Sequence, residues 1–105
     1  MKILFDHGTL APLRRALVGH SVTTAYEAHL STLSNGALLD TAEGEFGLLI
    51  TTDQSIKHQQ KLSGRQLAIL VLPTTNWKLL RNHLPLIVSI VNAMKAGEYR
   101  EMTLP

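Results

Sequence analysis

Hydrophobic and polar positions change their period several times along the chain, and each change marks an expected element. Two continuous apolar runs, at residues 46–52 and 67–72, predict strands that are covered by helices on both faces. Shorter apolar or β-branched runs at residues 3–5 and 21–26 predict two further strands. Weak alternation over residues 99–104 predicts a fifth strand at a sheet edge.

Helical periodicity separates these runs. It predicts helices over residues 9–18, 35–42, 55–62 and 77–94. The last helix has one apolar stripe, formed by Trp77, Leu80, Leu84, Ile87, Val91 and Met94. Because Pro85 lies inside this pattern, we expect a kink or two consecutive helices there.

Strands that alternate with helices predict an α/β fold with a mostly parallel sheet. We expect a three-layer sandwich of about five strands, similar to Rossmann-like domains. The 105 residues suit one domain over residues 1–105. Hydrophobic residues make up 45% of the chain and charged residues 17%, which is typical of a globular protein and not of a disordered one.

Composition narrows the function classes. The chain has no cysteine, which excludes a disulfide scaffold, a thiol nucleophile and a Cys-ligated metal. A net charge of +2 permits an anionic partner without requiring one. The apolar runs are too short to span a bilayer, and the N-terminus reaches an acid too early for a signal peptide. We therefore expect a cytoplasmic protein without a membrane partner.

Acidic residues follow several of the expected strands. Asp6 follows the first strand, Glu27 the second and Asp53 the third. In an open parallel sheet, ligands bind beyond the carboxyl ends of the strands. If the first and third strands are neighbours, the two aspartates can share a Mg²⁺ or Mn²⁺ ion, which activates water and stabilises charge on a phosphodiester. Short acids at strand ends also cap the following helices, so this structural role stays open beside the metal site.

Four segments, in order, carry a resemblance to a known family. They are Lys2-Ile3-Leu4-Phe5-Asp6, Gly19-His20-Ser21-Val22, Asn35-Gly36-Ala37-Leu38-Leu39-Asp40-Thr41-Ala42 and Leu49-Ile50-Thr51-Thr52-Asp53. Together they resemble a compact bacterial branch of the PIN-like nuclease superfamily. The resemblance implies a metal-dependent ribonuclease, often the toxin of a toxin–antitoxin pair. It implies Asp6 and Asp53, which stand at the matching positions, as metal ligands. Glu27 and Asp40 match no motif residue of the family, and they are nearby candidates to complete the catalytic site.

The chain departs from the family pattern at three places. Such relatives usually carry Asp-Glu-Asn after the first strand, where this chain has Asp6-His7-Gly8. They begin the second helix with an acid, where this chain has Asn35, and they often repeat an acid where it has Ser55. Two carboxylates hold an ion weakly. The alternative function is therefore a PIN-like fold that has lost catalysis and binds a protein or RNA.

Basic residues follow the third strand. Lys57, Lys61 and Arg65 lie four residues apart after Asp53, which places them on one face of an expected helix. They can steer RNA toward the carboxylates, or they form an ordinary solvated face. His7 directly follows the first aspartate, where it can act as a base or an auxiliary ligand, or be a solvent-exposed loop residue.

The long C-terminal helix has more apolar residues than one sheet face needs. Leu79, Leu86 and Ile90 lie off its stripe, and a second copy of the chain or an antitoxin protein can cover them. Tight packing within the chain is the alternative.

A receiver-like phospho-acceptor domain is a further reading from a different class. Asp6, Asp53 and Thr74 or Thr75 match the outline of its site. Receivers need adjacent acids after the first strand and a lysine after the fifth, and this chain has neither at those places. We therefore rank this function below the other two.

Overall fold

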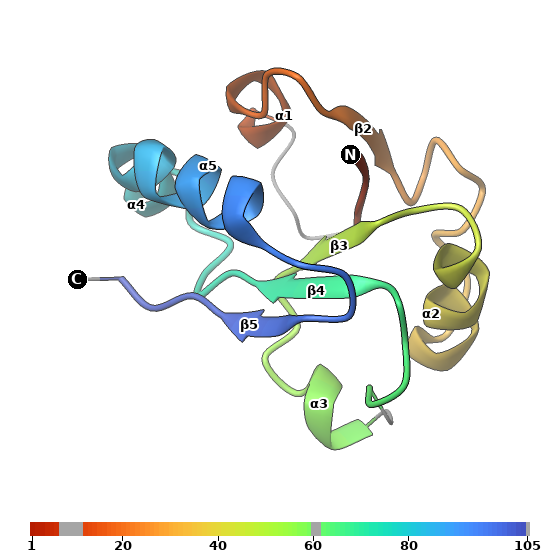
Figure 1. Ribbon diagram of the computed structural model, residues 1–105. Coiled ribbons are helices and arrows are strands. Elements are labelled where there is room, and N and C mark those ends of the chain that lie inside the picture. Colours follow the sequence, from red (N-terminus) through yellow and green to blue (C-terminus); the bar gives the residue numbers. More distant parts are fainter. Residues whose placement is uncertain (7–11, 60–61, 105) are drawn as a thin grey trace.

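Parallel strands form the centre of the protein in a computed structural model that describes residues 1–6, 12–59 and 62–104 (Figure 1). The sheet in these residues has the order β2-β1-β3-β4-β5, and every neighbouring pair is parallel. The strands are β1 (Lys2–Phe5), β2 (Ser21–Thr24), β3 (Leu48–Thr51), β4 (Ala68–Val71) and β5 (Tyr99–Glu101). The expected parallel α/β architecture is confirmed.

Helices cover both faces of this sheet and complete a three-layer sandwich (Figure 1). One face carries α1 (Leu13–Ala16), α4 (Trp77–Leu80) and α5 (Leu84–Ala93), and the other carries α2 (Asn35–Glu43) and α3 (Ile56–Gln59). Alternate residues of one strand point to opposite faces of the sheet and pack against different helical layers. In β1, Ile3 and Phe5 pack with the α1 and α5 layer, whereas Leu4 packs with the α2 and α3 layer.

Local sequence explains where these elements form. Every residue of β3 and β4 is buried, as the continuous apolar runs predict for strands between two helical layers. Helix α2 starts after Ser34, whose hydroxyl accepts a hydrogen bond from the N–H of Ala37 (3.4 Å). Helix α4 starts after Asn76, whose side chain accepts from the N–H of Lys78 (3.0 Å).

The long C-terminal helix is broken, as Pro85 predicts. A 3₁₀ turn (Arg81–His83) separates α4 from α5, and the proline lies in the first turn of α5, where its missing N–H has no intrahelical partner to lose. Of the three apolar residues off the stripe, Ile90 is buried in the core. Leu79 and Leu86 are 47% and 39% exposed.

Two expected helices are shorter in the structure. Helix α1 begins only at Leu13, and residues 9–11 lie outside the described residues. Residues 62–65 follow α3 as non-helical chain, and Gly64 has a φ of +83°. The expectation that Arg65 shares a helix face with Lys57 is therefore wrong, because the turn at Gly64 ends any helical register before it. Lys61 lies outside the described residues.

The chain reverses its direction of winding between β1 and β3. From β1 it passes through α1 to β2 on one side, and it returns through α2 on the opposite face to β3. The carboxyl ends of β1 and β3 therefore form the topological switch point, where open α/β sheets bind their ligands. In the register of this pair Phe5 lies opposite Ile50, so the strands deliver Asp6 and Thr51 side by side. The expectation that the first and third strands are neighbours is confirmed.

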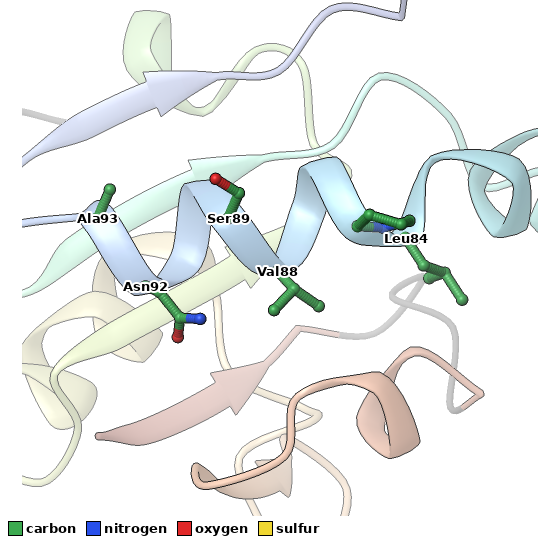
Figure 2. Close-up of a pocket in the computed structure, with 6 residues that line it drawn as sticks. Leu84, Val88, Ser89, Asn92 and Ala93 are labelled. Atoms are coloured by element: carbon green, nitrogen blue, oxygen red, sulfur yellow. The ribbon is translucent and has the colours of Figure 1, made fainter.

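The outer face of α5 carries an open apolar hollow of about 720 Å³ (Figure 2). Its lining residues are Leu84, Pro85, Val88, Ser89, Asn92 and Ala93. Val88 and Asn92 lie on the same side of the helix, and the Asn92 side chain hydrogen-bonds the His20 ring nitrogen Nε2 (2.7 Å) just before β2. Among the described residues, no helix has both the length and the apolar character needed to cross a membrane.

Candidate functional site

One hydroxyl connects the two aspartates at the switch point. Thr51, the last residue of β3, donates its Oγ1–H to Oδ2 of Asp6 (2.9 Å). The Oγ1 atom of Thr51 also accepts a hydrogen bond from the backbone N–H of Asp53 (3.1 Å). Thr51 is fully buried and Asp6 is only 5% exposed, so both side chains lie beneath the protein surface at this edge of the sheet. The structure therefore brings together the two residues that the sequence predicts as metal ligands.

The carboxylate of Asp53 is held by neutral donors. Its Oδ1 accepts both the backbone N–H (2.9 Å) and the hydroxyl (2.8 Å) of Ser55. Its Oδ2 accepts the side-chain amide of Asn35 (2.8 Å). The backbone N–H of Ser55 lowers the pKa of Asp53 most, followed by the Ser55 hydroxyl, and Asn35 adds to this against the opposing effect of burial. Asp53 is thus an anion at neutral pH, and it also fixes the turn that leads into α3.

Two of the three departures from the resembled pattern meet at this carboxylate, and the third, at His7 and Gly8, lies outside the described residues. Asn35 starts α2 and Ser55 precedes α3, and both donate to Asp53. Acids at these positions would need a shared cation to offset their repulsion, whereas an amide and a hydroxyl satisfy the carboxylate directly. Sequence reasoning identified both positions only as missing acids. Their contact with Asp53 follows from the strand order, which brings the start of α2 to the end of β3.

The Glu27 side chain contacts Thr24 and Arg14, and it stabilises the turn after β2. It forms a reciprocal capping pair with Thr24: the N–H of Thr24 donates to its Oε1 (2.9 Å), and its own N–H donates to the Thr24 hydroxyl (3.1 Å). Both terminal nitrogens of Arg14 also donate to its carboxylate. These contacts tie the turn after β2 to α1.

We expect Glu27 to titrate far below an ordinary glutamate. The hydrogen bond from Arg14, then that from the N–H of Thr24, lowers its pKa from 4.5 to about 2. Because the folded-state pKa is depressed, these contacts stabilise the fold above pH 4.5, and their contribution is lost as the pH falls toward 2. An NMR titration of the Glu27 carboxyl carbon measures this. In Arg14→Gln the midpoint should rise toward 4.5; an unchanged midpoint would contradict the assigned cause.

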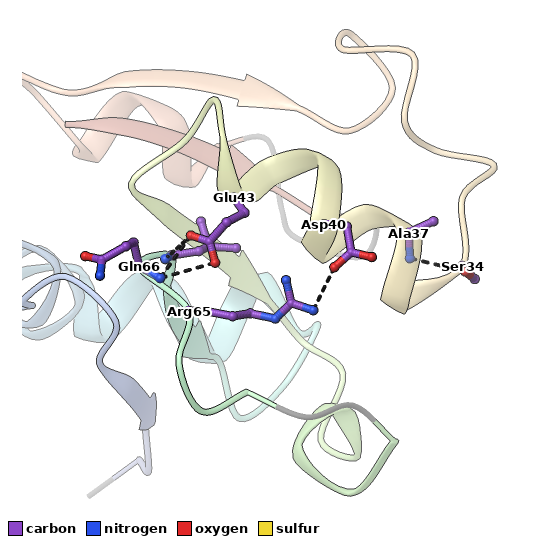
Figure 3. A network of polar contacts seen from close by, with 7 residues as sticks. Ser34, Ala37, Asp40, Glu43, Arg65 and Gln66 are labelled. Carbon is purple, nitrogen blue, oxygen red and sulfur yellow. Dashed lines mark hydrogen bonds and ion pairs between the residues drawn. The ribbon is translucent and has the colours of Figure 1, made fainter.

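Asp40 lies in α2, on the opposite face of the sheet from α1, and its ion pair connects α2 to the segment before β4 (Figure 3). It is 74% exposed and pairs with Arg65 (2.9 Å). One turn later, Glu43 accepts the backbone N–H groups of Gln66 and Leu67 (3.0 and 2.8 Å to Oε2). Within the described residues, no three His, Asp or Glu side chains are grouped so that they can hold a metal ion.

The described basic residues of the expected RNA-steering set are engaged in ion pairs. Lys57 pairs with Glu101 (2.7 Å), which also accepts the hydroxyl of Tyr99 (2.8 Å). Burial, and then this bond to the glutamate, raises the pKa of Tyr99 to about 12. Arg65 pairs with the exposed Asp40. Lys61 and His7 fall outside the described residues.

The donor set at the switch point fits a hard divalent ion. Mg²⁺ binds proteins through one or two carboxylates together with water and substrate phosphates. At this edge the Thr51 hydroxyl contacts the carboxylate of Asp6 and the backbone N–H of Asp53, which has the second carboxylate. The three hydrogen bonds on Asp53 compete with a metal for its oxygens. An ion at these two carboxylates would therefore need further ligands, such as water or a substrate phosphate.

Two further findings bear on the function classes. The strand order is also that of receiver domains, but the Thr74 hydroxyl accepts the N–H of Asn76 (3.0 Å) in the turn before α4. This hydroxyl therefore serves the local turn. Comparison with protein-family models, with curated proteins and with solved structures gave no match.

Proposed function

We propose that the chain is a PIN-like, metal-dependent ribonuclease whose site is the switch point between β1 and β3. The observation that carries this proposal is the Thr51 hydroxyl, which connects Asp6 and Asp53 at the carboxyl edge of the sheet. A Mg²⁺ or Mn²⁺ ion held by these two carboxylates would supply an activated water and offset the charge on an RNA phosphodiester.

The chain's own residues orient this site. Thr51 fixes the Asp6 side chain through its buried hydroxyl, which leaves that carboxylate little freedom to rotate. Ser55 and Asn35 hold Asp53 from two sides. Groups fixed in this way lose little entropy when a ligand binds. The proposed role of the surrounding residues is therefore positioning, and the two aspartates provide the charge.

Calorimetric titration with Mn²⁺ tests the metal site. We expect wild-type protein and Asp40→Asn, the control at an exposed aspartate outside the site, to bind alike. In Asp6→Asn and Asp53→Asn the affinity should fall by at least about tenfold, the smallest loss typical even of residues that only orient a metal ligand. Equal affinity in all four proteins would refute the assignment. Circular dichroism of each variant verifies folding, and RNA cleavage that survives both site substitutions would indicate a contaminating nuclease.

A second function is favoured by a specific observation, the neutral donors on Asp53. Because Asn35 and Ser55 satisfy this carboxylate without a cation, the chain also fits a PIN-like domain that has lost catalysis and binds RNA or a protein. Wild-type protein that binds RNA in EDTA but does not bind Mn²⁺ would select this function. A homodimer, or an antitoxin over the exposed Leu79 and Leu86, belongs to the toxin form of the first proposal.

A further inference from the structure

Tyr26 is the exposed aromatic residue of the described chain. Its side chain is 80% exposed, whereas the other four aromatic residues are buried or half-buried. It lies in the segment directly after β2, at the same edge of the sheet as the two aspartates. An exposed aromatic ring contributes little to folding, since its apolar area stays in water. The position therefore calls for an explanation outside the core.

The segment that carries Tyr26 is ordered. Ala25 is buried, and its N–H bonds the carbonyl of Phe5 (2.8 Å), the residue before Asp6. The N–H of Leu30 returns to the carbonyl of Ala25 (2.8 Å), which closes a compact turn around Tyr26. His29 within this turn has a φ of +60°, a conformation that non-glycine residues seldom adopt.

Contacts from a second element hold the turn further. Glu27 forms reciprocal hydrogen bonds with Thr24, and Arg14 of α1 donates to its carboxylate. The backbone on both sides of Tyr26 is therefore fixed. A ring displayed on an ordered support binds a ligand with little further loss of chain entropy. This gives Glu27 a positioning role for the segment that carries Tyr26.

The surroundings of the ring indicate the ligand. One hollow of about 270 Å³ is lined by Tyr26, His29, Ser31 and Thr32. A second hollow, of about 370 Å³, is lined by Arg14, Arg15, Thr24 and Glu27 on the same segment and on α1. An aromatic face beside hydroxyls suits an unpaired base. Arg14 is already paired with Glu27, and the exposed guanidinium of Arg15 suits a phosphate.

We infer that residues 24–32 bind single-stranded RNA, with a base stacked on Tyr26 and the backbone phosphate near Arg15. Single-stranded bases are available for stacking, whereas those of a duplex are already stacked. This inference deepens the proposed function, because it specifies the strand class that would reach Asp6 and Asp53. It does not require the metal, so the two proposals can fail separately.

Fluorescence anisotropy with a labelled oligouridylate of about twelve nucleotides, in EDTA, tests the inference. We expect wild-type protein and Tyr26→Phe, which keeps the ring, to bind alike. Tyr26→Ala should bind about five- to 150-fold more weakly, the loss expected for one stacked base. A control, Val18→Ala, changes another exposed apolar residue (85%) and should have no effect. Circular dichroism verifies that each variant folds.

The outcomes separate the two proposals. Binding by Tyr26→Ala that equals wild type, equal loss in Tyr26→Phe, or tighter binding of a duplex of the same length would each overturn the inference. Absence of RNA binding in wild type would overturn it too, and would leave a protein partner as the ligand of this ring. Asp53→Asn should retain RNA binding in EDTA. Its loss of Mn²⁺ affinity tests the metal site alone.

Discussion

Gly97→Ala is expected to destabilise the protein by about 2–5 kcal/mol, a large part of the roughly 5–15 kcal/mol that stabilises a typical domain. Gly97 has a φ of +76°, and a Cβ built there would lie 2.6 Å from the backbone carbonyl oxygen of Arg65. Two costs therefore combine: left-handed strain and a clash with main chain that cannot rotate away. The N–H of Gly97 also bonds the carbonyl of Gln66 (2.8 Å), so relief of the clash would pull the start of β5 from β4.

Gly64→Ala provides the matched control. Gly64 has a similar φ of +83°, but nothing lies within 4 Å of its Cβ position. We expect this variant to lose only the conformational part, roughly 1–2 kcal/mol. Urea denaturation of both variants gives the two losses, and their difference measures the clash alone. Equal losses would show that the contact with Arg65 relaxes at no cost.

Thr51→Val is expected to destabilise the protein by about 1–3 kcal/mol, although the two side chains have nearly the same shape. The substitution removes the donor to the buried Oδ2 of Asp6 and the acceptor of the Asp53 N–H. Removing a hydrogen-bond donor from a buried carboxylate and an acceptor from a backbone N–H has a high cost, whereas no cavity forms. Thermal and urea unfolding measure the loss.

Thr52→Val is the control for this hydroxyl. Thr52 is the next residue, it is half-buried, and its hydroxyl makes no hydrogen bond within the described residues. We expect a change within about 0.5 kcal/mol. If Thr51→Val is equally mild, the hydroxyl bridge does not hold the site together, and the positioning role of Thr51 is refuted.

The layers of the fold could be predicted because the apolar pattern of each short segment indicates which of its faces are buried. The apolar runs around Leu49 and Leu70 are uninterrupted, and only a strand between two helical layers buries both of its faces in this way. Pro85 likewise predicted the break between α4 and α5. Element ends were less predictable. Apolar residues such as Phe46 continue beyond the hydrogen-bonded ladder because they pack against a neighbouring layer.

The candidate site could be predicted only in part. Asp6 and Asp53 were found because they end strands, and neighbouring parallel strands deliver such residues to one edge. The partners of Glu27 and Asp40 were not predictable, since Arg14 and Arg65 belong to other elements and meet them only after the layers pack. Tyr26 carried no sequence signal at all, because its exposure depends on how the turn after β2 is anchored.

The strand order also limits when the chain can fold during its synthesis. β1 is synthesised first, yet it lies between β2 and β3 in the finished sheet, and Ile3 pairs with Leu48. A nascent chain that ends before residue 48 contains only the β1–β2 pair, and two strands alone do not form a stable sheet in water. Productive folding on the ribosome must therefore wait until β3 has emerged. Until then the apolar face of β1 is a surface for chaperones to protect, and the protein cannot be divided there into two folding halves.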